Sequence, residues 1–149
     1  MIPSSPMVRP LQEDDFQNWK TVWTDYLTFY ETTLEDIIYE MTFARLISPQ
    51  NRSQNAMVAS RGDELLGLVH FIFHPHNWKI EEVCYLQDLY VCQTVRGMGI
   101  GKSLIEAVYD EADRRNSPTV YWLTQDFNEQ ARHLYDKVAH LTPFIKYNR

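Results

Sequence analysis

The chain has 149 residues, of which 44% are hydrophobic and 13% aromatic, so its length and composition predict one globular domain spanning residues 1–149. The formal net charge of −6 argues against a nucleic-acid binder and suits a cationic substrate. The start of the chain lacks the basic and apolar regions of a signal peptide, and no apolar run approaches the roughly 20 residues that span a bilayer, so we expect a soluble cytoplasmic protein.

The first part of the chain predicts a strand and two helices. Residues 7–11 form a short strand whose proline places it at an edge, and Glu13 then begins an acidic run that favours a helix start. Aromatic and apolar residues follow at helical spacing, which predicts a face turned to the core: Phe16, Trp19, Trp23, Tyr26, Leu27 and Tyr30. Residues 33–46 predict a second helix, capped by Thr32 or Thr33.

The middle of the chain predicts an antiparallel meander. Residues 56–60, 65–74 and 81–91 have strand character, and the turn at 61–64 joins the first two. Because successive strands with short connections pair as neighbours, we expect these three to lie side by side.

The last third predicts two helices and two further strands. Residues 100–115 form the clearest amphipathic helix, with apolar side chains along one face and arginines at its end. Residues 119–124 predict a buried strand, a last helix starts near Asn128, and residues 143–147 predict a final strand.

A glycine-rich loop stands between the third strand of the meander and the clearest helix. Its sequence is Arg96-Gly97-Met98-Gly99-Ile100-Gly101-Lys102. Glycines let the backbone approach an anion closely, and a following helix N-terminus offers free N–H groups and a positive dipole end, so the loop predicts a site for a phosphorylated cofactor. It is not a P-loop, because Arg96 stands where the first glycine belongs, and it comes too late in the chain for a dinucleotide-binding turn.

Two motifs together resemble the GNAT superfamily of N-acetyltransferases. The first is Arg96-x-x-Gly99-x-Gly101 after a strand, which resembles the family's acetyl-CoA loop. The second is Asn128-x-x-Ala131-x-x-Leu134-Tyr135, which resembles its cofactor-binding helix. With the flanking strands, the resemblance covers about residues 6–147. It implies the GNAT α/β fold, a mixed and mostly antiparallel sheet of about six or seven strands with splayed central strands and about four flanking helices.

The resemblance also implies an acetyl-CoA site. Where the strands splay, the main chain of residues 89–91 contacts the acetyl and pantetheine portion, and the loop holds the pyrophosphate with charged donors that strengthen phosphate hydrogen bonds. Asn128 is either a helix cap alone or also a pantetheine ligand. The expected cofactor-binding residues are Leu89, Tyr90, Val91, Arg96, Gly97, Met98, Gly99, Ile100, Gly101, Lys102, Ser103 and Asn128.

Acetyl transfer requires a base, an oxyanion donor and an acid. By resemblance Tyr135 is the acid that donates a proton to the leaving sulfur, which other routes could also protonate, and a backbone N–H of residues 89–91 stabilises the oxyanion. The base stays open. Spermidine/spermine and thialysine acetyltransferases have Glu where Gln87 stands. Neutral Gln cannot accept a proton, so either Asp88, Glu82 or Glu81 acts through water, or the amine arrives deprotonated. Regular alternation points Asp88 to the face opposite Gln87.

The expected acceptor is a primary amine of a small cationic molecule such as a polyamine, diamine or amino acid. Its predicted ligands are Tyr26, Tyr30, Glu31 and Gln87. Protein or peptide acetylation and a non-catalytic acyl-CoA-binding module stand as alternatives. Because related enzymes resembling yeast histone and polyamine acetyltransferases are often dimers, we expect a homodimer. His70, His74 and His76 are candidate metal ligands by their spacing. No carboxylate partner is evident near them in the sequence, and the resemblance implies no metal.

Overall fold

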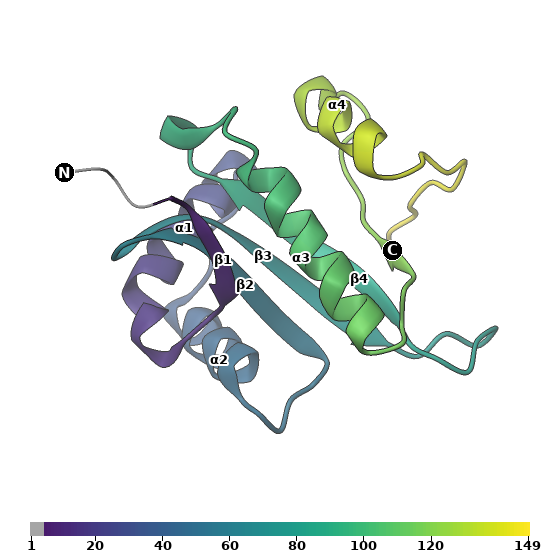
Figure 1. The fold of residues 1–149 in the computed structure, drawn as a ribbon, viewed down its shortest axis with the longest axis horizontal. Helices are drawn as coiled ribbons and strands as arrows, with labels where there is room; N and C mark the ends of the chain where they lie inside the picture. The colour runs from purple at the N-terminus through teal and green to yellow at the C-terminus, as the bar shows by residue number, and fades with distance from the viewer. Residues whose placement is uncertain (1–4) are drawn as a thin grey trace.

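The computed structural model describes residues 5–149, and its strands form a five-stranded mixed sheet in the order β1-β2-β3-β4-β5 (Figure 1). β2, β3 and β4 form the predicted antiparallel meander, β1 joins it antiparallel to β2, and β5 runs parallel to β4. The bounds are Met7–Pro10 (β1), Gln54–Arg61 (β2), Glu64–His74 (β3), Val83–Val91 (β4) and Val120–Tyr121 (β5). Because the strand order follows the chain, β1 and β5 are the two edges.

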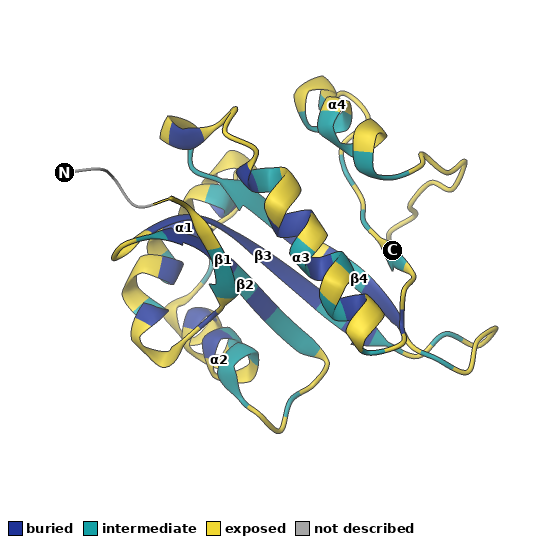
Figure 2. Ribbon diagram, in the orientation of Figure 1, coloured by how far each residue is buried: buried dark blue, intermediate teal, exposed yellow. Residues whose placement is uncertain are grey.

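Helices cover both faces of the sheet. On one face, the predicted aromatic stripe of α1 packs with α2 against β2 and β3, forming a core that contains Trp19 and Trp23. On the other face, α3 packs its apolar side against the sheet, forming a second core around Leu104 and Val108. The helix bounds are Phe16–Phe29 (α1), Asp36–Ile47 (α2), Ile100–Arg114 (α3) and Glu129–Val138 (α4), and short 3-10 turns occupy Glu13–Asp15 and Gln93–Val95. Figure 2 shows the central strands buried between these layers.

The second helix begins later than predicted. α2 starts at Asp36 after Glu35, without a side-chain cap, so the predicted caps Thr32 and Thr33 do not start it. The reason lies in how α1 ends. Glu31 takes a left-handed φ of 55°, and the amide of Thr32 donates to a carbonyl in the last turn of α1. These residues therefore close the first helix and are not free to open the second.

A bulge interrupts the pairing of β3 with β4. His70 lies opposite Asp88, and Phe71 lies opposite Leu86, so Gln87 is the extra residue. Under regular alternation Leu86 and Asp88 would share a face, but the bulge separates them. Leu86 packs in the core under α3, whereas Asp88 joins His70 on the α1 face.

The sheet splays between β4 and β5, as the resemblance implied. β5 is shorter than the predicted strand 119–124, and it pairs with β4 at Cys84 and Tyr85 alone within the described chain. Residues 86–91 of β4 therefore have no strand partner on that side among residues 5–149. Their main chain is free to bind something else along this edge.

The predicted final strand at 143–147 does not form, and the sheet has five strands instead of six or seven. A strand needs an edge to pair with, and the neighbouring β5 offers two paired residues. The segment after α4 is irregular, and its large apolar side chains are 76–87% exposed: Leu141, Phe144, Ile145 and Tyr147. Figure 2 shows this segment mainly in the colour of exposed residues.

Within residues 5–149, no helix combines the length and apolar character needed to cross a bilayer. The expected cytoplasmic location stays a prediction.

Candidate active site

The α1 face of the sheet carries a buried polar chain that begins at α1 and ends at the bulge. The indole N–H of Trp19 donates to Nε2 of His70 over 3.0 Å. Nδ1 of His70 lies 2.8 Å from Oδ2 of Asp88. All three residues are buried. Asp88 is thus a carboxylate held at the splay by His70 of β3, and Trp19 of α1 holds His70 in turn.

Tyrosine side chains gather around the Asp88 carboxylate. Burial, followed by the negative charge of Asp88, raises the pKa of each of Tyr26, Tyr30 and Tyr85. Tyr26 and Tyr30 come from the end of α1, where their ring centroids lie 5.1 Å apart. These hydroxyls therefore stay protonated at neutral pH, and they surround the carboxylate with donors and aromatic faces that suit a bound cation.

Tyr135 reaches the same place from α4. Burial, followed by the nearby Tyr30, raises the pKa of Tyr135 to about 12. Its ring meets that of Trp122 edge to face, with centroids 5.4 Å apart. The structure thus brings together four of the predicted site residues: Tyr26, Tyr30, Asp88 and Tyr135.

The glycine-rich loop has the backbone that anion binding requires. Gly97 and Gly99 take φ of 83° and 80°, a left-handed region that side chains disfavour. Gly99 caps α3, so the first N–H groups of this helix have no carbonyl of the helix to bond and point outward at the loop. At Gly101 a Cβ would lie 3.2 Å from Leu134 of α4, so glycine allows α3 and α4 to approach each other here.

The charged residues of the loop lie exposed. Nε of Arg96 donates to the carbonyl of Val91 over 3.0 Å, and its guanidinium lies over the Tyr90 ring. Nζ of Lys102 lies 3.8 Å from a carboxylate oxygen of Glu106. Because the Arg96 bond uses Nε, the two terminal nitrogens remain as donors for a phosphate.

The splayed edge of β4 points different side chains to the two layers. Leu89 and Val91 pack against the core under α3, and Tyr90 packs against the core under α1. A ligand along this edge would therefore meet main-chain groups more than side chains. This arrangement fits the predicted main-chain contacts of residues 89–91 with acetyl-CoA.

The remaining predicted residues lie outside the buried cluster. Gln87 is exposed at the bulge, and Glu31 is exposed beyond the end of α1. Glu82 is exposed just before β4, about 20 Å along the strand from Asp88 at the usual rise per residue. Asp88 is thus better placed than Glu82 to act on an amine near Tyr135.

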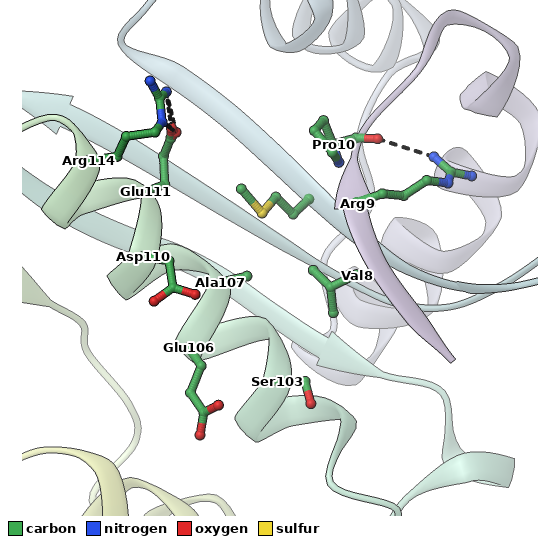
Figure 3. Close-up of a pocket in the computed structure, with 10 residues that line it drawn as sticks. Val8, Arg9, Pro10, Ser103, Glu106, Ala107, Asp110, Glu111 and Arg114 are labelled. Atoms are coloured by element: carbon green, nitrogen blue, oxygen red, sulfur yellow. Dashed lines mark hydrogen bonds and ion pairs between the residues drawn. The ribbon is translucent and has the colours of Figure 1, made fainter. Parts of the chain in front are cut away.

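The predicted site is distinct from the groove between β1 and α3. This groove has a volume of about 500 Å³, and Figure 3 shows the side chains that line it, including the carboxylates of Glu106 and Asp110 on α3. Of the predicted site residues, Ser103 lines it, and no member of the Asp88 cluster does. We therefore place the candidate active site at the splay.

Two residues of the cluster have roles that the sequence did not predict. Trp19 belongs to the aromatic stripe that was expected in the core. His70 is one of the three histidines for which no carboxylate partner was evident in the sequence, and the structure gives its ring such a partner in Asp88. The ring also bonds Trp19, and no group of three or more potential metal ligands occurs among residues 5–149. The sequence offered one sign of this role, because His70 is a polar residue in an otherwise apolar strand and a buried polar group needs a hydrogen-bond partner.

Comparison with known proteins connects this geometry to a family. The model of the acetyltransferase (GNAT) family matches residues 11–140. The D-amino-acid N-acetyltransferase HPA3 of Saccharomyces cerevisiae is 36% identical over 151 residues, which cover 100% of this chain and 93% of the yeast protein. A thialysine N-epsilon-acetyltransferase of Mus musculus is 30% identical over 101 residues, covering 68% of this chain and 55% of the mouse protein.

Solved structures share the fold. A ribosomal-protein-alanine N-acetyltransferase from Brucella melitensis biovar Abortus 2308 superposes with a TM-score of 0.81 at 21% identity, over 97% of this chain and 99% of that one. The enzyme AAC(6')-Iy, solved in complex with a bisubstrate analogue of CoA, superposes with a TM-score of 0.85 at 14% identity, over 98% of both chains. The expected GNAT fold is therefore confirmed, although with fewer strands than predicted.

Proposed function

Since the chain belongs to the acetyltransferase (GNAT) family and is an acetyl-CoA-dependent N-acetyltransferase, we propose that its acceptor is a primary amine of a small cationic molecule. The observation that carries the proposal is the Asp88 carboxylate buried among tyrosines at the splay. A buried carboxylate with aromatic neighbours favours a compact cation, because charge and ring faces both attract it. The names of the yeast and mouse relatives support an amino acid or a lysine-like amine within this class.

Acetyl-CoA is proposed to bind along the free edge of β4, with its pyrophosphate at the glycine-rich loop. The N-terminus of α3 and the cations Arg96 and Lys102 supply the donors for phosphate. Main-chain groups of residues 89–91 hold the acetyl end, and Asn128 stands at the start of α4. Its side chain accepts from the amide of Ala131 over 3.3 Å, so it acts as a helix cap, and its amide N–H₂ remains for a ligand.

We propose Asp88 as the base and Tyr135 as the donor to the leaving sulfur. Asp88 first accepts a proton from the bound ammonium, directly or through water. The neutral amine then attacks the acetyl carbonyl, and the C–S bond breaks as the thiolate leaves. Tyr135, with a pKa of about 12, is a weaker acid than a thiol near 8.5. It therefore stabilises the thiolate by a hydrogen bond, and the proton that finally reaches sulfur comes from the amine. Glu82 would require a long water chain.

The experiment that tests the acceptor class is mass-detected acetyl transfer from acetyl-CoA. The panel contains D- and L-amino acids, lysine analogues, polyamines and basic peptides. We expect turnover of small amines, with KM values well below those for any peptide, because one buried carboxylate among tyrosines matches the single charge of a compact cation. Peptide turnover that exceeds small-amine turnover would favour the protein-acetylating alternative. Tight acetyl-CoA binding without any product would favour the binding module.

We also propose that the protein is a homodimer that covers its C-terminal segment. Phe144 and Ile145 are 86% and 78% exposed. This segment and β5 leave a cavity of about 520 Å³ between them, so the two do not pack closely. Burying one such side chain contributes about 1.5–3 kcal/mol of favourable free energy. A second copy of the chain that covered these side chains would therefore be stabilised in the dimer. The prediction that residues 1–149 form one domain in each subunit also stays a prediction.

The dimer is tested by light scattering after gel filtration. The native chain is expected to run at twice its 17.7 kDa mass, and the double variant Phe144→Asp, Ile145→Asp is expected to run as a monomer. Trp78→Asp is the matched control, because Trp78 is equally exposed but lies in the β3–β4 loop. A native monomer, or a dimer that survives the double substitution, would contradict the proposal.

A further inference from the structure

The polar chain behind Asp88 joins three elements that are distant in sequence. Trp19 lies on α1, His70 on β3 and Asp88 on β4, and their exposed fractions are 0%, 5% and 8%. The two bonds connect residues 51 and 18 positions apart. Buried polar groups that bond in this way cost little to bury, and they allow few alternative arrangements of the side chains.

The indole N–H of Trp19 determines the tautomer of the His70 ring. An indole N–H donates and never accepts, so Nε2 of His70 must carry a lone pair. A neutral imidazole then has its hydrogen on Nδ1, which donates to Oδ2 of Asp88. The only basic nitrogen of His70 is therefore already bonded to Trp19, so the ring cannot accept a proton from the amine without breaking that bond.

We infer that Trp19 and His70 are positioning residues that hold the Asp88 carboxylate toward the acceptor amine. The inference rests on the proposed role of Asp88 as the base. His70 anchors one carboxylate oxygen, Oδ2, and leaves Oδ1 to the acceptor. Trp19 selects the ring tautomer that donates to Asp88, because the other tautomer would turn an Nδ1 lone pair toward a carboxylate. The bulge at Gln87 provides the backbone turn that aligns Asp88 with His70.

The test separates the two bonds of His70 with two amide variants. His70→Asn places an amide N–H₂ near the position of Nδ1, so it keeps the donor to Asp88 and loses the acceptor for Trp19. His70→Gln reaches the position of Nε2, so it keeps a partner for Trp19 and loses the donor to Asp88. His70→Gln loses a bond to a charged carboxylate, whereas His70→Asn loses a bond to a neutral indole, so thermal melts are needed to measure the cost in stability of each. A purely structural role predicts that activity falls only as far as stability does.

We expect His70→Gln to lower kcat by about 10²-fold, the cost of a misplaced catalytic group, while His70→Asn stays within about tenfold of native. KM for acetyl-CoA should change little in either variant. Trp19→Phe keeps a ring in the core and is expected to lower kcat about tenfold, because the His70 ring loses the bond that holds its orientation against Asp88. Thermal melts and acetyl-CoA titrations show that each variant is folded, and Trp19→Phe provides the test if a His70 variant fails to fold.

Equal loss of kcat in the two His70 variants, or loss in neither, would overturn the inference. The role of Asp88 itself is measured separately with Asp88→Asn. If that variant is inactive while His70→Gln matches native kcat, the positioning inference fails and the proposed function stands. If Asp88→Asn is fully active, the proposed base is wrong, and the positioning role fails with it.

Discussion

Replacing Asp88 with Asn is expected to lower kcat by about 10²–10⁴-fold, the usual contribution of a general base. Asn has the same shape, and its amide oxygen still accepts the bond that His70 donates to Oδ2. It cannot take a proton, so the variant removes the chemistry and preserves the packing. The measurement is kcat for the best acceptor of the panel, determined with saturating acetyl-CoA.

Other carboxylates provide the comparison for Asp88. Asp36→Asn is the matched control, because Asp36 is an exposed residue paired with Lys20 at 3.3 Å, and kcat should not change. Glu82→Gln tests the competing base. A fall in kcat for Glu82→Gln together with native activity for Asp88→Asn would show that the proton leaves through the exposed glutamate instead.

Replacing Tyr135 with Phe is expected to lower kcat by about 10²-fold with little change in KM for acetyl-CoA. The ring still packs against Trp122, and the hydroxyl that stabilises the departing thiolate is lost. Because the hydroxyl acts mainly as the sulfur leaves, the loss belongs to the transition state and appears in kcat. Tyr109→Phe is the matched control, since it also removes a tyrosine hydroxyl beside Trp122, but one that donates to the carbonyl of Val138.

The pH dependence of the Tyr135 effect has a definite sign. Burial raises the pKa of Tyr135 to about 12, so the hydroxyl keeps its proton up to a higher pH than an ordinary tyrosine, whose pKa is about 10. The ratio of native to Tyr135→Phe rates should therefore stay constant from pH 7 to about pH 10. A ratio that falls by half near pH 10 would show an unperturbed hydroxyl, and would place Tyr135 in contact with bulk water.

The local features of the chain were predictable because local chemistry produces them. Gly97 and Gly99 were expected in a loop before a helix, and their positive φ values are a property of glycine itself. The helix from Asn128 to Tyr135 follows from a cap and a 3.6-residue repeat. Order, spacing and these two motifs thus identified the fold and located the glycine-rich loop without knowledge of any long-range contact.

The tertiary structure alone decided how the candidate active site is built. Periodicity places neighbouring strand residues on opposite faces, but it contains no sign of the bulge that sets Asp88 beside His70. The bond from Trp19 joins residues 51 positions apart, and the failed strand at 143–147 lacks an adequate edge to pair with. The sequence by itself therefore determined the family, the fold and the place of the glycine-rich loop before α3. Only folding decided which carboxylate is buried and held, because strand register and buried hydrogen bonds depend on distant partners.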